Sequence, residues 1–146
     1  MQNIKETRGR LLGVDFGDTR TGLATCDVGR MLASGVGYIS PGGIVKTADA
    51  VAKEATERGV VGVIVGLPVN MNGSEGPRAA RCREFADLLR ERLEIPVAMI
   101  DERMTTMAAS RYLNETDTRG KKRKGVIDSL AAELILQSAL DRLKNM

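Results

Sequence analysis

The stretch LLGVDFGDTRTGLA, residues 11–24, joins two apolar runs through the tetrad Gly-Asp-Thr-Arg at 17–20. Glycine and short polar residues between apolar runs predict a β-hairpin. Asp15 lies before the turn, inside the first apolar run, where an isolated charge is costly unless it is paired. One interpretation is that Asp15 supports the turn through local hydrogen bonds. We favour the other, that Asp15 is a functional carboxylate.

Length and composition are those of one globular domain, 1–146. The chain has 146 residues, of which 42% are hydrophobic and 28% charged, and this is enough to bury a core without disulfides. Residues 1–10 are polar, and we expect a flexible arm there. No apolar window is long enough to span a membrane. We therefore expect a cytoplasmic protein without a membrane partner.

Several classes of chemistry are excluded by residue usage. The chain contains no histidine, which rules out Ser-His-Asp or Cys-His nucleophile systems and any zinc site with histidine ligands. Its two cysteines, Cys26 and Cys82, match neither a disulfide framework nor metal-ligand spacing. The net charge of +3 does not repel polyanions. Any catalysis must therefore depend on carboxylates.

The apolar pattern predicts an α/β fold. We expect strands at 11–16, 21–27, 31–39, 60–67 and 95–100, and helices at 44–58, from 77 onward, from 105 or 106 to about 114, and from about 126 to 144. Short turns make the first three strands antiparallel. Right-handed crossovers place the fourth and fifth strands parallel to the first. The result is a mixed five-stranded sheet with helices on both faces.

Four acidic residues are expected to converge at the carboxyl ends of the parallel strands, where ligands gather in such sheets. They are Asp15, Asp101, Glu102 and Asp128. Carboxylates about 4 Å apart repel each other strongly, so a cluster of them favours a cation, and hard oxygen ligands select Mg²⁺ or Mn²⁺. Two alternatives stay open. Asp128 could be an acid of the first helical turn that interacts favourably with the helix dipole, and Asp101 or Glu102 could pair with Arg103.

A carboxylate site holding two cations can cleave phosphodiester bonds in line, and two polar segments could bind the substrate. The segment 116–125 is basic, and we expect it to be mobile without a ligand; its cations are Arg119, Lys121, Lys122, Arg123 and Lys124. The loop 68–77 precedes a helix and could contact phosphates; its candidates are Asn70, Asn72, Ser74 and Arg78. Arg20 and Arg103 complete the expected nucleic-acid contacts. The basic segment could instead be a solvated connector, and the loop a plain linker.

Four segments in order resemble the YqgF family, described as Holliday junction resolvases and as pre-16S ribosomal RNA processing nucleases. They read GVDFGDTRTGLA, VVGVIVGLPVNMNGSEGPRAARCREFADLL, IDERMTTMAA and DSLAAELILQSAL. The resemblance implies a ribonuclease H-like fold, a Mg²⁺-dependent nuclease and a bacterial cytoplasmic setting. It also implies that Asp15, the pair Asp101-Glu102, and Asp128 take the metal-binding places.

One feature departs from the wider ribonuclease H-like pattern, in which a carboxylate often follows the fourth strand. Here that strand ends in Gly66-Leu67-Pro68, so the second ligand is assigned to the fifth strand. Neighbouring strand residues point to opposite faces, and only one of Asp101 and Glu102 should therefore face the metal.

The expected function is metal-dependent hydrolysis of structured nucleic acid, by processing of the 5′ end of pre-16S ribosomal RNA. A Holliday junction resolvase acting on branched DNA and a non-catalytic nucleic-acid-binding adaptor are the alternatives. The hairpin also resembles the phosphate-binding hairpin of actin-like ATPases, but those join two such domains and this chain has the length of one. Whether the protein acts as a monomer or a homodimer stays open.

Overall fold

The computed structural model describes residues 1–103 and 120–146, with side chains up to residue 103 and from residue 129 onward. The elements in chain order are α1 (Gln2–Lys5), β1 (Leu11–Asp15), β2 (Thr21–Cys26), β3 (Ala33–Ile39), α2 (Ile44–Arg58), β4 (Gly62–Leu67), α3 (Pro77–Arg92), β5 (Val97–Asp101) and α5 (Gly120–Lys144).

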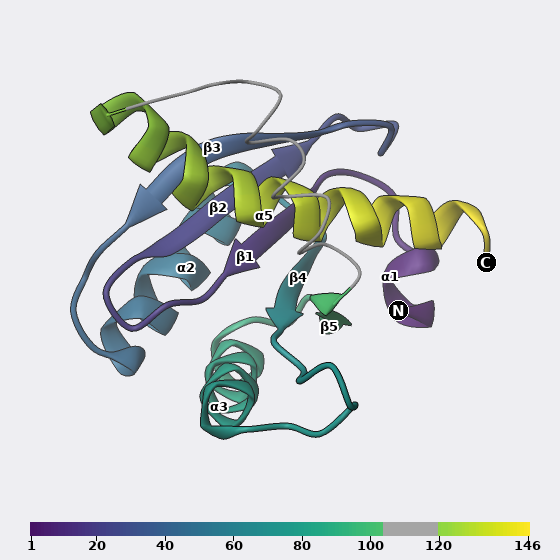
Figure 1. Ribbon diagram of the computed structural model, residues 1–146. Helices are drawn as coiled ribbons and strands as arrows, with labels where there is room; N and C mark the ends of the chain where they lie inside the picture. Colours follow the sequence, from purple (N-terminus) through teal and green to yellow (C-terminus); the bar gives the residue numbers. More distant parts are fainter. Residues whose placement is uncertain (104–119) are drawn as a thin grey trace.

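The five strands form one mixed sheet in the order β3-β2-β1-β4-β5. β1 pairs antiparallel with β2, and β2 with β3, whereas β4 runs parallel to β1 and β5 parallel to β4. Helix α5 crosses one face of this sheet, and α2 and α3 cover the other (Figure 1). The predicted fold class is therefore confirmed.

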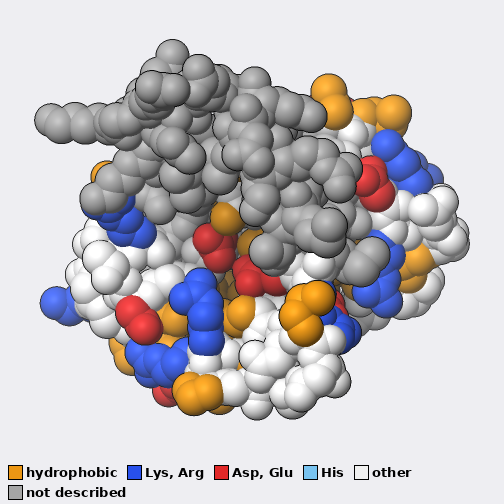
Figure 2. Space-filling model, in the orientation of Figure 1, with side chains coloured by type: hydrophobic (Ala, Val, Ile, Leu, Met, Phe, Trp, Pro, Cys, Tyr) orange, Lys and Arg blue, Asp and Glu red, His pale blue; other side chains and the backbone are white. Residues whose placement is uncertain are grey.

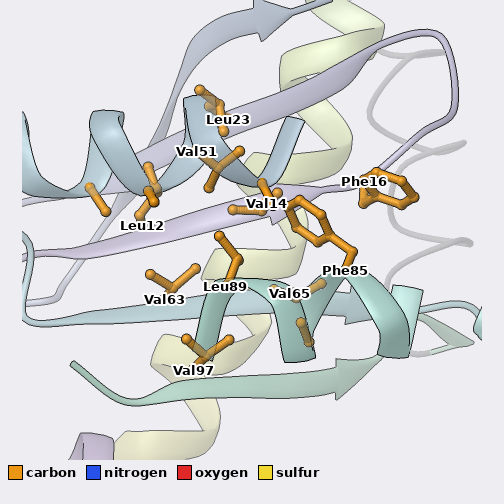
Figure 3. Close-up of a cluster of buried hydrophobic side chains, with 14 of the residues drawn as sticks. Leu12, Val14, Phe16, Leu23, Val51, Val63, Val65, Phe85, Leu89 and Val97 are labelled. Atoms are coloured by element: carbon orange, nitrogen blue, oxygen red, sulfur yellow. The ribbon is translucent and has the colours of Figure 1, made fainter. Parts of the chain in front are cut away.

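The core between the sheet and helices α2 and α3 is built by strand alternation. Leu12 and Val14 of β1 point to this face with Val65 of β4, and all three are fully buried (Figure 3). Beyond the end of β1, Phe16 stacks on Phe85 of α3 with ring centroids 4.5 Å apart. This contact fixes α3 beside the carboxyl end of β1.

On the other face α5 approaches the sheet closely because β1 and β3 carry glycine there. A Cβ atom at Gly13 would lie 2.7 Å from Cβ of Leu136, and one at Gly35 would lie 2.8 Å from Cβ of Ser129. A residue with a side chain at either position would push the helix away from the sheet.

Several sequence predictions differ from the structure at the ends of elements; β4 and β5, for example, each begin two residues later than predicted. Residues 2–5, expected in a flexible arm, form α1, and Ile4 is fully buried because it packs in the apolar cluster beneath α5. The guanidinium of Arg30 holds this segment through hydrogen bonds to the carbonyl oxygens of Ile4 and Gly9. Strand β3 begins at Ala33 rather than 31 because the Asp27 carboxylate accepts hydrogen bonds from the backbone at 31 and 32. Helix α5 begins at Gly120, six residues before its predicted start.

The earlier start of α5 corrects the interpretation of the basic segment. Residues 121–124 belong to the first turns of a helix rather than to a connecting loop. The helix predicted from 105 or 106 to about 114 lies outside the described residues, as does Arg119.

Candidate functional site

Asp15 is the last residue of β1 and lies on the sheet face that α5 crosses. Leu11 and Gly13 of the same strand face α5, and the alternation of β1 gives Asp15 the same direction. Asp15 is half-buried and pairs with Gly22 across the hairpin. The structure thus places the carboxylate at the end of a strand, not within the turn.

Glu102 reaches the same place from two strands away. Its backbone N–H donates to the carbonyl of Leu67 at 2.9 Å, a hydrogen bond of the last β4–β5 pair, Leu67 with Asp101. Its side chain lies over Gly66, where a Cβ atom would come within 2.5 Å of Glu102 Oε1. Glycine at position 66 therefore gives Glu102 room to turn toward Asp15.

The two carboxyl groups interact electrostatically. Burial raises the pKa of Glu102 to about 7, and the Asp15 carboxylate adds to this rise by repulsion and through a side-chain hydrogen bond. Arg78 lowers the pKa of Glu102 and so offsets part of the effect. A raised carboxyl pKa beside a second carboxylate is characteristic of functional sites.

Asp101 takes a different role from its neighbour. Its carboxylate accepts hydrogen bonds from the backbone N–H of Arg103 at 2.8 Å and from Arg103 Nε at 2.8 Å. The Arg103 guanidinium holds the pKa of Asp101 below its usual value. Of the two acids after β5, Glu102 thus lies with Asp15, and Asp101 pairs with Arg103.

The third expected carboxylate, Asp128, lies within α5, immediately before Ser129, which packs on Gly35. Its side chain is outside the described residues. Among the side chains that the structure does describe, no three acidic, cysteine or histidine residues come together as a metal-ligand cluster. The described part of the site is therefore the pair Asp15 and Glu102.

A hollow of about 210 Å³ lies between the hairpin and the start of α3. Its lining residues are Phe16, Gly17, Asp18, Pro77, Arg78 and Arg81. Figure 2 shows acidic side chains in the middle of this face of the molecule with basic side chains beside them. Arg78, which also contacts the carbonyl of Phe16 at 3.5 Å, places a cation between this hollow and Glu102.

The loop 68–76 is folded upon itself. Asn70 Nδ2 donates to Ser74 Oγ at 3.0 Å, and Ser74 Oγ donates to Asn72 Oδ1 at 2.6 Å. The guanidinium of Arg103 contacts the carbonyl of Met71 at 3.5 Å, so the loop lies against the residues after β5. The three polar side chains predicted to meet phosphate are thus brought together, in hydrogen bonds with one another.

Of the remaining residues predicted to contact nucleic acid, the structure describes the side chain of Arg20 but not those of the cations in α5. Arg20 lies at the end of the hairpin turn, with its guanidinium carbon 5.0 Å from the ring centroid of Tyr38. The side chains of Lys121, Lys122, Arg123 and Lys124, in the first turns of α5, are outside the described residues.

Two residues near the carboxylates were missed by sequence reasoning. Cys82 of α3 is buried, and burial raises the pKa of its thiol to about 11, with further rises from Glu102 and Asp15. Arg81 lines the hollow and forms an ion pair with Asp18 at 3.6 Å. The available signal was helical spacing, because residues 78, 81, 82 and 85 lie on one side of α3.

Comparison with known proteins places the chain in a family. The family model RuvX, described as Holliday junction resolvase, matches residues 9–142. A protein of Phenylobacterium zucineum named "Putative pre-16S rRNA nuclease" is 45% identical over 138 residues, covering 93% of this chain and 88% of the relative. A protein of Caldanaerobacter subterraneus with the same name is 46% identical over 137 residues, covering 93% and 99%.

Solved structures share the fold at low sequence identity. Thermus thermophilus RuvC in complex with a Holliday junction substrate superposes with a TM-score of 0.62 at 13% identity, covering 94% of this chain and 97% of that one. The fowlpox virus Holliday junction resolvase gives a TM-score of 0.52 at 12% identity, covering 94% and 99%. These likenesses support the ribonuclease H-like sheet. With the family model matching from residue 9 to residue 142, the chain belongs to the RuvX family of nucleic-acid-hydrolysing enzymes.

Proposed function

We propose that this protein is a divalent-metal-dependent nuclease that processes the 5′ end of pre-16S ribosomal RNA. The observation that carries the proposal is the convergence of Asp15 and Glu102 on one sheet face, where the pKa of Glu102 is raised to about 7. The names of the two bacterial relatives supply the substrate. Their coverage of the chain extends over both carboxylates.

The donor set fits a hard divalent cation. Asp15 and Glu102 bring carboxylate oxygens together, and Mg²⁺ and Mn²⁺ prefer such ligands. We assign these two residues as ligands and Asp128 as the third, and we leave Asp101 to position Arg103. When bound, the cation supplies activation of the attacking water and stabilisation of the leaving oxygen.

The remaining residues serve substrate binding in this proposal. Arg78 lies beside Glu102 and borders the hollow at the start of α3, so it can bind the phosphate next to the scissile bond. Arg103 holds the loop 68–76 beside the carboxylates through its contact with Met71. The cations at 121–124 would contact phosphates farther along the strand without reading sequence.

The test is cleavage of an RNA that spans the 5′ end of the 16S precursor, with EDTA, Mg²⁺ or Mn²⁺. We expect cleavage by the parent chain only with metal, and none by Asp15→Asn. Asp87→Asn is the matched control, because Asp87 lies on the exposed face of α3, where it pairs with Arg90 at 2.9 Å. Binding of RNA without cleavage under every metal condition would instead identify a non-catalytic adaptor.

A second candidate is resolution of branched DNA, favoured by the description of the matching family model. A four-way DNA junction offered beside the RNA, at equal concentration and with the same metals, separates the two. Symmetric nicking of the junction with the RNA left intact would overturn the assignment to ribosomal RNA.

We also propose that the protein acts in the cytoplasm. In the described ranges, no helix is long and apolar enough to cross a membrane. Light scattering of the protein with and without RNA measures its molecular mass and so distinguishes a monomer from a homodimer.

A further inference from the structure

Tyr38 stands out among the aromatic residues whose side chains are described. Phe16 and Phe85 are buried in the core, whereas Tyr38 is 45% exposed. The guanidinium of Arg20 lies over the Tyr38 ring, with its carbon 5.0 Å from the centroid. Arginine stacked on tyrosine forms a flat cationic surface, and unpaired nucleobases stack on such surfaces.

A β-bulge turns Tyr38 toward the face that carries Asp15. On β3, Gly35 faces α5, and strict alternation would send residue 38 to the opposite face. The pairing of β2 with β3 shifts at Val36, so that Leu23 pairs with Gly37 whereas Ala24 pairs with Gly35. The shift restores Tyr38 to the face of α5, and the backbone of Gly37, with φ of 117°, accommodates it.

Strand register then aligns Tyr38 with the carboxylate. Tyr38 pairs with Gly22, and Gly22 pairs with Asp15, so the three residues form one row across β3, β2 and β1. Two strand spacings separate the ends of the row, a distance of about 10 Å. Gly22, between them, has no side chain.

The hairpin turn is tied to the end of β3. Ser40 Oγ donates a hydrogen bond to the carbonyl oxygen of Thr19 at 2.7 Å. Thr19 precedes Arg20, and Ser40 follows Tyr38 by two residues. This bond holds the two strands together where the arginine and the tyrosine meet.

We propose that Tyr38 and Arg20 form a stacking platform for an unpaired base of the nucleic acid whose backbone lies at Asp15 and Glu102. The inference rests on the proposed nuclease function and deepens it, because it names single-stranded nucleic acid beside the cleaved bond as the preferred ligand. A duplex keeps its bases paired and gains nothing from the platform.

The test measures binding without cleavage, in the full chain carrying Asp15→Asn. The probes are a single-stranded RNA, the same RNA as a blunt duplex, and the single strand with abasic sites at its centre, all at one salt concentration. Tyr38→Leu should weaken binding of the single strand about 5- to 150-fold, the loss expected when one base loses its aromatic partner. Tyr38→Phe should restore most of the affinity.

Controls separate stacking from a change in fold. Val45→Ala removes an exposed apolar side chain from α2, on the other side of the sheet, and should leave all three affinities unchanged. Tyr38→Leu should bind the duplex and the abasic strand with the same affinity as the protein with native Tyr38. Equal losses on single strand and duplex, or no loss on either, would overturn the inference.

The outcome also separates this inference from the proposed function. If the chain with native Asp15 cleaves RNA with metal but Tyr38→Leu leaves single-strand binding unchanged, the stacking platform is refuted and the nuclease assignment stands. If binding depends on Tyr38 but no metal condition gives cleavage, the stacking platform stands and the nuclease assignment is refuted.

Discussion

Replacing Glu102 with glutamine should stabilise the metal-free protein at neutral pH. A pKa raised from 4.5 to about 7 means that ionised Glu102 costs free energy in the folded state. Each pKa unit corresponds to about 1.4 kcal/mol, so the cost has an upper bound of about 3.5 kcal/mol. Water reaches this half-buried carboxyl and screens it, and we therefore expect about 1 to 2 kcal/mol.

The sign of the effect depends on pH. Below pH 4.5 the carboxyl is protonated in both states and contributes no difference. Between pH 4.5 and about 7 the unfolded chain loses its proton while the folded chain keeps it, so the parent loses stability as pH rises. Glutamine does not titrate, and the advantage of Glu102→Gln should therefore grow from pH 5 to pH 8.

Urea unfolding in EDTA at pH 5 and pH 8 measures this difference. Asp101→Asn is the matched control with the opposite sign, because Arg103 lowers the pKa of Asp101. The ionised form of Asp101 stabilises the fold above pH 3.8. The loss of unfolding free energy in Asp101→Asn should therefore be the same at pH 5 and pH 8. An advantage of Glu102→Gln that does not change between pH 5 and pH 8 would refute the argument that Asp15 and burial raise the pKa of Glu102.

Asp15→Asn should abolish metal-dependent cleavage while raising or preserving the melting temperature in EDTA, since it relieves repulsion of Glu102; a large fall in melting temperature would assign Asp15 to a structural role. Gly66→Ala should destabilise the fold by about 1 to 3 kcal/mol in urea unfolding, because its Cβ would lie 2.5 Å from Ile135 Cδ1 and from Glu102 Oε1; unchanged stability would show that both side chains can move aside. Neutralising the four cations at 121–124 should lower the slope of log affinity against log salt by up to about 3 to 4 on duplex nucleic acid, measured by titration at several salt concentrations, and parallel slopes would show that these cations do not reach phosphate.

The sequence alone determined the order of elements and the fold class. The apolar run VVGVIVGL requires a central strand, and the hairpin at 11–24 together with right-handed crossovers leaves few arrangements of the other strands. Its position also made Asp15 a candidate functional residue, because a charge inside an apolar strand is costly unless it is paired. Alternation along the fifth strand further predicted that only one of Asp101 and Glu102 faces the site.

Only the tertiary structure decided which of the two it is. Asp101 and Glu102 are adjacent acids beside the same Arg103, and the sequence does not show which of them pairs with it. In the structure Gly66 of the neighbouring strand β4 makes room for Glu102, and Arg103 engages Asp101. The sheet face on which Tyr38 lies could not be predicted from the sequence either. A bulge at Val36 changes the face of every later residue in β3, and this shift depends on pairing with β2 rather than on the local composition of the strand.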